Sequence, residues 1–138
     1  MIWTSWDRHR DLGLLLLRVG IGLMFMYYGW PKIMGGPAAW TKLGGAVGNF
    51  GITIAPVFWG FMAAFAEFGG GLLLALGLFF RVASMLLAAT MIVAVSTKFA
   101  AGAGLSGAAQ PLQLAILFLS LILIGPGRYS FDDSYRRR

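Results

Sequence analysis

The chain has 138 residues, which suits a single domain, and 59% of them are hydrophobic whereas only 12% are charged. Soluble domains are about 45–50% apolar and about 25% charged, so a soluble bundle of this size could not cover its exterior with polar groups. Intrinsic disorder is excluded as well, because disordered chains have low hydrophobicity. The composition therefore indicates a small protein that crosses a lipid bilayer several times.

The residue types that carry most metal and redox chemistry are scarce. The chain has no cysteine, which excludes disulfides, iron–sulfur ligation and a cysteine nucleophile. His9 is the single histidine and lies in the polar N-terminal segment, so a bis-histidine haem or a histidine-rich metal site cannot be built. We expect no metal site, and the sequence leaves open whether the chain has catalytic activity of its own.

Four apolar segments are long enough to cross a membrane, for which about 20 residues are needed. We expect spans over about 12–34, 56–80, 81–99 and 109–125. The first is longer than the apolar region of a signal peptide and no cleavage pattern follows it, so we expect it to be retained. The prediction is an all-α fold with one domain over residues 1–138, in which four transmembrane helices form an antiparallel bundle.

The connections between these spans differ in length. The longest covers residues 35–55, is rich in glycine and contains Trp40. Residues 38–47 could form a short helix in the outer membrane interface, with Trp40 at the level of the headgroups. The second and third spans are joined by a very tight turn around residues 77–81.

Basic residues are distributed unequally between the two sides of the predicted bundle. Four spans place both termini on one side, and lysine and arginine accumulate in cytoplasmic loops. The side with the termini would carry Arg8, Arg10, Arg81, Arg128, Arg136, Arg137 and Arg138, whereas the other would carry Lys32, Lys42 and Lys98. We therefore expect a multi-pass protein of the plasma membrane (the bacterial inner membrane) with cytoplasmic termini. The terminal arginines are expected to lie against anionic lipid headgroups, and we expect no nucleic-acid partner.

Arg18 and Glu67 are the two charged residues that lie well inside the apolar spans, away from their ends. At 1.5 Å per residue Arg18 lies about 10 Å into the first span, and Glu67 lies about 14 Å from the same membrane face. A charge at mid-bilayer costs about 2.5–3.5 kcal/mol, and arginine can hold a carboxylate through two parallel hydrogen bonds. We expect the two side chains to pair, either lining a polar cavity or fixing the register of the helices. The alternative is that Arg18 extends to the inner interface.

Aromatic and basic side chains gather at the outer ends of the spans. Tyr27, Tyr28 and Trp30 are typical of an aromatic belt, although Tyr28 or Trp30 could instead stack on a planar ligand such as a quinone. Lys32 and Lys98 lie at the outer boundary, where lysine extends to water, and either could bind an anionic headgroup or a ring carbonyl. The candidate ligand-binding residues are Arg18, Tyr28, Lys32, Glu67 and Lys98.

Three blocks of the sequence resemble the DoxX family and keep the order they have there. They are residues 18–25 with Gly29 and Lys32, residues 67–81, and residues 125–132. The resemblance covers most of the chain, from about Leu12 to Asp132, and implies a four-helix bundle in the inner membrane. The family's motif positions correspond to Arg18, Lys32, Glu67, Arg81 and Arg128.

The DoxX resemblance also carries an implication for function. The family is named after a small subunit associated with a terminal quinol oxidase and with thiosulfate:quinone oxidoreductase, which implies a role beside a membrane oxidoreductase. Two positions depart from the family pattern. Residues 96–99 stand where members often carry a histidine, and Gln110 stands where they often carry a glutamate.

We therefore expect a small membrane subunit that binds a quinone or a lipid in a polar cavity and supports an oxidoreductase complex. In this hypothesis Glu67 accepts a hydrogen bond or relays a proton, Arg18 sets its charge state and Tyr28 contacts the ring. The alternative is a non-enzymatic scaffold, assembly factor or cargo binder. A permease is less favoured because four spans leave little room for alternating access, and faces rich in small residues are compatible with a homodimer.

Overall fold

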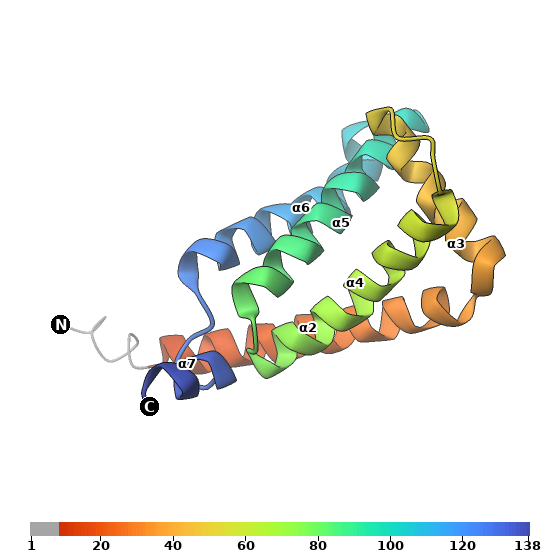
Figure 1. Ribbon diagram of the computed structural model, residues 1–138. Helices are drawn as coiled ribbons and strands as arrows, with labels where there is room; N and C mark the ends of the chain where they lie inside the picture. Colours follow the sequence, from red (N-terminus) through yellow and green to blue (C-terminus); the bar gives the residue numbers. More distant parts are fainter. Residues whose placement is uncertain (1–8) are drawn as a thin grey trace.

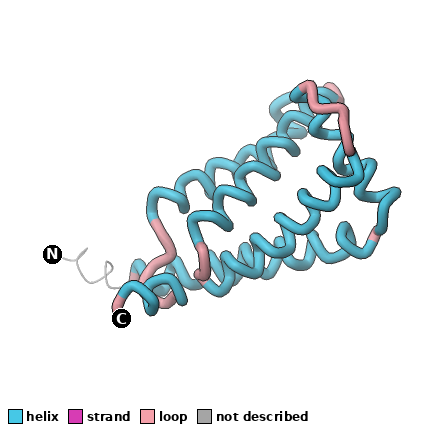
Figure 2. Tube along the Cα trace, in the orientation of Figure 1, coloured by secondary structure: helices cyan, strands magenta, loops and turns pink. Residues whose placement is uncertain are grey.

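A computed structural model describes residues 9–138, and this part of the chain is helical without strands (Figure 2). Arg8, which enters the charge comparison above, lies outside the described residues. The long helices are α2 (Arg10–Met34), α4 (Pro56–Leu76), α5 (Phe80–Ala100) and α6 (Gly104–Ile124). The shorter elements are α3 (Gly36–Gly44), the 3-10 helix η1 (Gly45–Phe50) and α7 (Phe131–Arg136). Each of the four long helices is long and apolar enough to cross a membrane.

The observed helix ends differ from the expected spans at two places. Helix α4 ends at Leu76 rather than near residue 80, because Gly77 takes a left-handed conformation with φ of 69° and its N–H caps the last turn. Helix α6 begins at Gly104 rather than near residue 109, so Pro111 lies inside the helix, where its ring removes a single backbone hydrogen bond. A short helix is present near residues 38–47, as α3 followed by η1.

The long helices are arranged as two pairs. The most extensive contacts are those of α2 with α4 and of α5 with α6, while contacts between α4 and α5 join the pairs. Figure 1 shows these pairs as two layers, with α7 lying beside the start of α2 at the end where α4 turns into α5.

Glycines bring α2 and α4 close together. A Cβ on Gly22 would lie 2.5 Å from the carbonyl oxygen of Gly71, and one on Gly29 would lie 2.7 Å from the nitrogen of Phe68. Small residues allow this approach of two backbones in a membrane. Later residues of α2 therefore contact earlier residues of α4.

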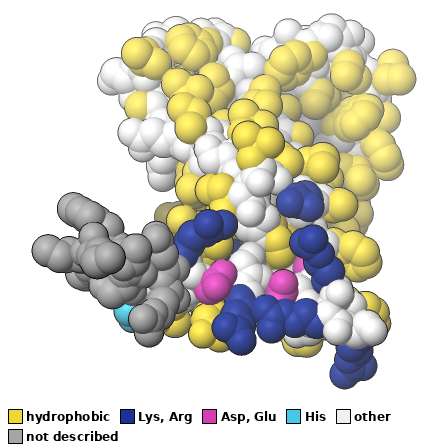
Figure 3. Space-filling view, turned by 90° about the vertical axis from the view of Figure 1, so that its left-hand side faces the viewer, with side chains coloured by type: hydrophobic (Ala, Val, Ile, Leu, Met, Phe, Trp, Pro, Cys, Tyr) yellow, Lys and Arg dark blue, Asp and Glu magenta, His cyan; other side chains and the backbone are white. Residues whose placement is uncertain are grey.

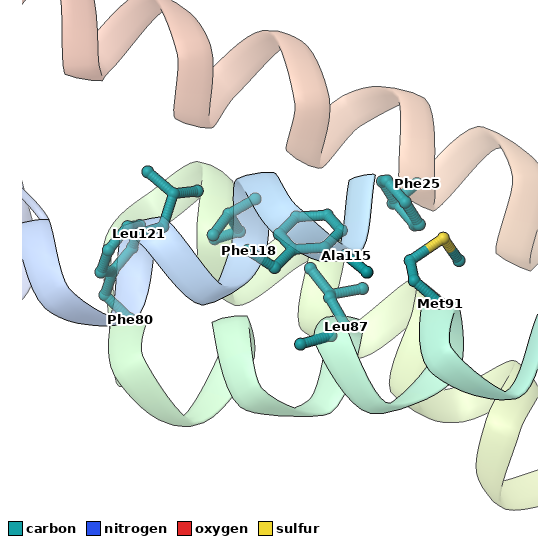
Figure 4. Close-up of a cluster of buried hydrophobic side chains, with 9 residues drawn as sticks. Phe25, Phe80, Leu87, Met91, Ala115, Phe118 and Leu121 are labelled. Carbon is teal, nitrogen blue, oxygen red and sulfur yellow. The ribbon is translucent and has the colours of Figure 1, made fainter. Parts of the chain in front are cut away.

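The apolar core fills the space between the two helix pairs. Figure 4 shows side chains from α2, α5 and α6 pointing toward one another, among them Phe25, Leu87, Met91 and Phe118. The rings of Phe25 and Phe118 meet edge to face with centroids 5.2 Å apart. The outward faces carry large exposed apolar side chains such as Leu123, as a protein surrounded by lipid requires.

Candidate functional site

Glu67 and Lys32 form an ion pair between α4 and α2. The Oε2 of Glu67 lies 2.7 Å from the Nζ of Lys32, which donates a hydrogen bond to it. Glu67 is only 7% exposed, whereas the side chain of Lys32 is 39% exposed. The close approach at Gly29 holds α2 against the residue after Glu67, and helical side chains lean toward the N-terminus of their helix. Lys32 therefore reaches back from the end of α2 to the middle of α4.

Aromatic side chains pack on the parts of α2, α3 and α4 next to the Lys32–Glu67 pair. Helix α3 packs on the start of α4, and Trp40 donates its indole N–H to the carbonyl of Lys32 over 3.0 Å. The ring of Trp40 meets Phe61 edge to face, with centroids 5.0 Å apart. On the neighbouring turn, Trp30 and Phe68 lie with ring centroids 5.7 Å apart. These contacts fix the end of α2 that carries Lys32.

The chemistry of this pair is that of a hydrogen-bonding site. An ammonium group has three N–H donors, and within residues 9–138 the Glu67 carboxylate is the one partner found for that of Lys32. The exposed part of Lys32 can therefore donate to a carbonyl or phosphate oxygen, while the carboxylate can accept from a hydroxyl.

The predicted pairing of Arg18 with Glu67 is wrong. Arg18 is 1% exposed and its Nη2 donates to the carbonyl of Tyr129 over 2.5 Å, at the end of the molecule where α7 lies. From residue 18 to residue 32, the partner of Glu67, the helix rises about 21 Å. A membrane depth estimated from residue number does not tell which cation contacts Glu67. The side chain of Lys32, near the end of α2, can reach back to it. Such estimates also do not indicate that the C-terminal segment, residues 125–138, packs against the end of the bundle and contacts Arg18.

The surroundings of Arg18 are built from the turn between α4 and α5 and from the C-terminal segment. A Cβ on Gly77 would lie 1.8 Å from Nη1 of Arg18, so the guanidinium group lies directly against this turn. The carboxylate of Asp132 accepts hydrogen bonds from the backbone N–H groups of Phe79 and Phe80, at 2.9 and 2.8 Å. Asp132 thus caps the start of α5 and provides a favourable charge for Arg18. Sequence reasoning missed this role of Asp132, although the residue lies in the third DoxX-like block.

The other candidate residues are not brought to the ion pair. Tyr28 is half exposed, and its ring contacts that of Tyr27 with centroids 5.6 Å apart. Lys98 is exposed near the end of α5. Among residues 9–138, no hydrogen bond, ion pair or ring contact links either of them to Lys32 or Glu67. Their part in ligand binding stays a prediction.

Two cavities of the molecule lie away from the ion pair. One has a volume of about 560 Å³ and lies at the end with α7, between the start of α5 and the C-terminal segment. The other is an apolar groove of about 650 Å³ along the first half of α2, lined by residues from His9 to Val19. Neither cavity is lined by Lys32, Glu67 or Arg18. The exposed side of Lys32 instead opens on the outer surface of the bundle.

Comparison with known proteins places this architecture among bacterial membrane proteins. The DoxX family profile matches residues 13–102. The "Inner membrane protein YqjF" of Escherichia coli is 31% identical over 125 residues, which cover 88% of this chain and 91% of the relative. An "Uncharacterized protein" of Haemophilus influenzae is 29% identical over 138 residues, which cover 96% of this chain and 97% of the relative.

A third relative carries an enzymatic name. The "Putative oxidoreductase CatD" of Bacillus subtilis is 34% identical over 87 residues, which cover 63% of this chain and 60% of the relative. No solved structure matches the chain. Together with the four apolar helices, the relatives show a multi-pass protein of the inner membrane.

Proposed function

Since the chain belongs to the DoxX family, we propose that it is a small inner-membrane subunit that binds a quinone or a lipid at the Lys32–Glu67 pair and supports a membrane oxidoreductase. The single observation that carries the proposal is the 2.7 Å contact between a buried carboxylate and a half-exposed ammonium group. Intramembrane ionisable groups are expensive in lipid and by default mark functional sites.

The residues around the pair fit a quinone ring. Lys32 can donate to a ring carbonyl and Glu67 can accept from a ring hydroxyl, while Trp30 and Phe68 offer aromatic surface beside them. Quinones dissolve in lipid, so a site that opens on the outer surface of the bundle needs no enclosed cavity. A bound quinone would supply the electron-carrying chemistry for which the chain has no side chains of its own. The phosphate of a lipid headgroup would fit the same ammonium donor.

Support for the oxidoreductase part comes from the CatD relative, whose name describes such an activity. In our proposal the four long helices cross the bilayer in alternating directions, with both termini in the cytoplasm. The arginines at the end with α7 support this orientation, because cytoplasmic loops carry an excess of basic residues.

Titration of the detergent-purified full chain with decylubiquinone, followed by tryptophan fluorescence, tests the site. We expect Lys32→Met to weaken binding about tenfold or more, because a hydrogen bond to a charged group contributes about 1.5–3 kcal/mol. Glu67→Gln should weaken it as well, since it frees Lys32 from its anchor. Lys42→Met removes an exposed lysine of α3 and serves as the matched control. Equal affinities for Lys32→Met and Lys42→Met would overturn the assignment of the site.

A second candidate is a non-enzymatic scaffold, assembly factor or cargo binder. It is favoured by the way Arg18 and Asp132 hold the fold together through hydrogen bonds to the backbone, and by the extensive exposed apolar faces of the long helices. A partner whose abundance falls when this chain is deleted, but not when Lys32→Met replaces it, would favour the scaffold over the ligand-binding subunit.

A further inference from the structure

A cavity of about 560 Å³ at the end with α7 collects basic side chains from distant parts of the sequence. Its arginines are Arg81 at the start of α5, Arg128 in the segment after α6, and Arg136 and Arg137 at the end of α7. Figure 3 looks onto this end, where dark blue basic side chains surround the magenta acidic ones below an otherwise apolar face. The volume lies within the range of about 300–1,000 Å³ that is typical of small-ligand sites.

The acidic residues of this cavity are already engaged by the chain itself. Asp11 accepts a hydrogen bond from the backbone N–H of Arg128 at 3.1 Å. Asp132 accepts from the two N–H groups at the start of α5, and Asp133 pairs with Arg137 at 2.8 Å. Three carboxylates are thus occupied with backbone donors or with one arginine.

The remaining arginines keep unused donors. The Nε of Arg81 donates a hydrogen bond to the carbonyl of Ile122 at 3.0 Å, so its two terminal nitrogens remain available beside the cavity. Within residues 9–138, the side chains of Arg128 and Arg136 have no hydrogen-bond or ion-pair partner. Guanidinium groups bind phosphate oxygens through two parallel N–H donors, and such groups at a membrane surface attract anionic lipids.

We propose that this basic cavity, defined by Arg81, Arg128 and Arg136, binds an anionic phosphate group. Its apolar edge identifies the carrier as a phospholipid, because exposed Phe79, Val82 and Ile124 line the same cavity and can contact acyl chains. A soluble phosphate ester would bind the arginines but would have no acyl chain to contact these apolar side chains. The site lies at the opposite end of α2 from Lys32, away from the Lys32–Glu67 pair, and it does not rest on the function proposed for that pair.

Binding of short-chain phosphatidylglycerol to the detergent-purified full chain, measured by titration calorimetry, tests this proposal. Short-chain phosphatidylcholine and inorganic phosphate are titrated in parallel. We expect phosphatidylglycerol to bind most tightly, and the double variant Arg128→Gln/Arg136→Gln to weaken it about 30-fold, which corresponds to about fivefold for each arginine near a membrane surface. Arg128→Lys retains the charge but not the two parallel N–H donors, so it should weaken binding less than Arg128→Gln does.

The matched control is Arg10→Gln/Arg138→Gln, which removes two charges from the same end of the molecule but outside the cavity lining. It should change the affinity by less than about twofold, because exposed charges at a distance are screened by salt. Equal weakening by both double variants, or equal binding of phosphatidylcholine, would overturn the cavity as a specific site. Binding of inorganic phosphate as tight as that of phosphatidylglycerol would keep the phosphate site and overturn the lipid as its source.

Discussion

Arg18 is almost fully buried, and its guanidinium group holds the C-terminal segment to the bundle through the carbonyl of Tyr129. Its Nε and Nη1 are buried without a hydrogen-bond partner in the described part of the chain, so the nearby charge of Asp132 is needed to offset the loss of water. Glu67 depends on a different cation, Lys32, at the other end of α2. The two charges inside the apolar helices therefore act separately.

This separation predicts the outcome of two double-mutant cycles on thermal unfolding in detergent. Lys32→Met and Glu67→Gln should show a coupling of about 0.5–1 kcal/mol, at the low end for contacting residues because Lys32 is more than a third exposed. Arg18→Met should cost about 1.5–3 kcal/mol, because it removes the charged hydrogen bond to the carbonyl of Tyr129 that holds the C-terminal segment. Its effect should add to that of Glu67→Gln within about 0.5 kcal/mol. A strong coupling between Arg18 and Glu67 would contradict the observed contacts.

The sequence is sufficient to single out Glu67 and Lys32, but not to pair them. A lone carboxylate inside an apolar segment can be recognised from the sequence, and so can a lysine at the end of such a segment. The partner depends on how close α2 and α4 come at Gly29 and on the direction in which the lysine side chain leans. Neither follows from residue counting, because a depth estimate at 1.5 Å per residue ignores the reach of side chains.

At the scale of the elements, the close approach of α2 to α4 depends on one glycine face. Gly22 of α2 lies against the backbone of Gly71, whereas Gly20 of the same helix has no atom near the position of a Cβ. Glycine inside a helix is otherwise destabilising relative to alanine by about 0.5–1 kcal/mol. The two positions therefore separate the effect of helix propensity from that of helix packing.

Gly22→Ala should lower the stability of the protein, whereas Gly20→Ala should not. The added methyl group at position 22 would meet the carbonyl oxygen of Gly71 at 2.5 Å, and overpacking of this kind costs about 1–3 kcal/mol. At position 20 the same change should be neutral or stabilising. Unfolding temperatures of the two variants in one detergent check this, and equal shifts would show that α2 and α4 do not pack through the Gly22 face.

The elements themselves were predictable to different degrees. Apolar runs of about 20 residues identify the long helices, and Trp40 in a glycine-rich connection indicates the short helix α3. The helix α7 was not predicted, because a short polar segment has no periodic pattern of its own. It is held in place by tertiary contacts, in which Asp132 caps α5 and its N–H donates to the carbonyl of Gly77.

At the scale of the whole molecule, the two ends of the bundle carry different chemistry. The end with α7 gathers arginines and the basic cavity, whereas Lys32, Trp40 and the aromatic rings gather toward the other. In our proposal the basic end lies in the cytoplasm, because cytoplasmic loops carry an excess of lysine and arginine. The proposed phospholipid would then belong to the inner leaflet, and a quinone at Lys32 would be bound toward the outer one.

Single cysteines can test this orientation directly, because the chain has none of its own and each introduced thiol is unique. Ser134→Cys in α7 and Ala101→Cys in the turn between α5 and α6 are both exposed and change the side chain little. In intact spheroplasts, a thiol reagent that does not cross membranes should label the cysteine at position 101 and not the one at position 134. Inverted vesicles should show the reverse pattern. Labelling of position 134 from the outside would show the opposite orientation. The basic cavity would then face the periplasm, and its lipid would have to come from the outer leaflet.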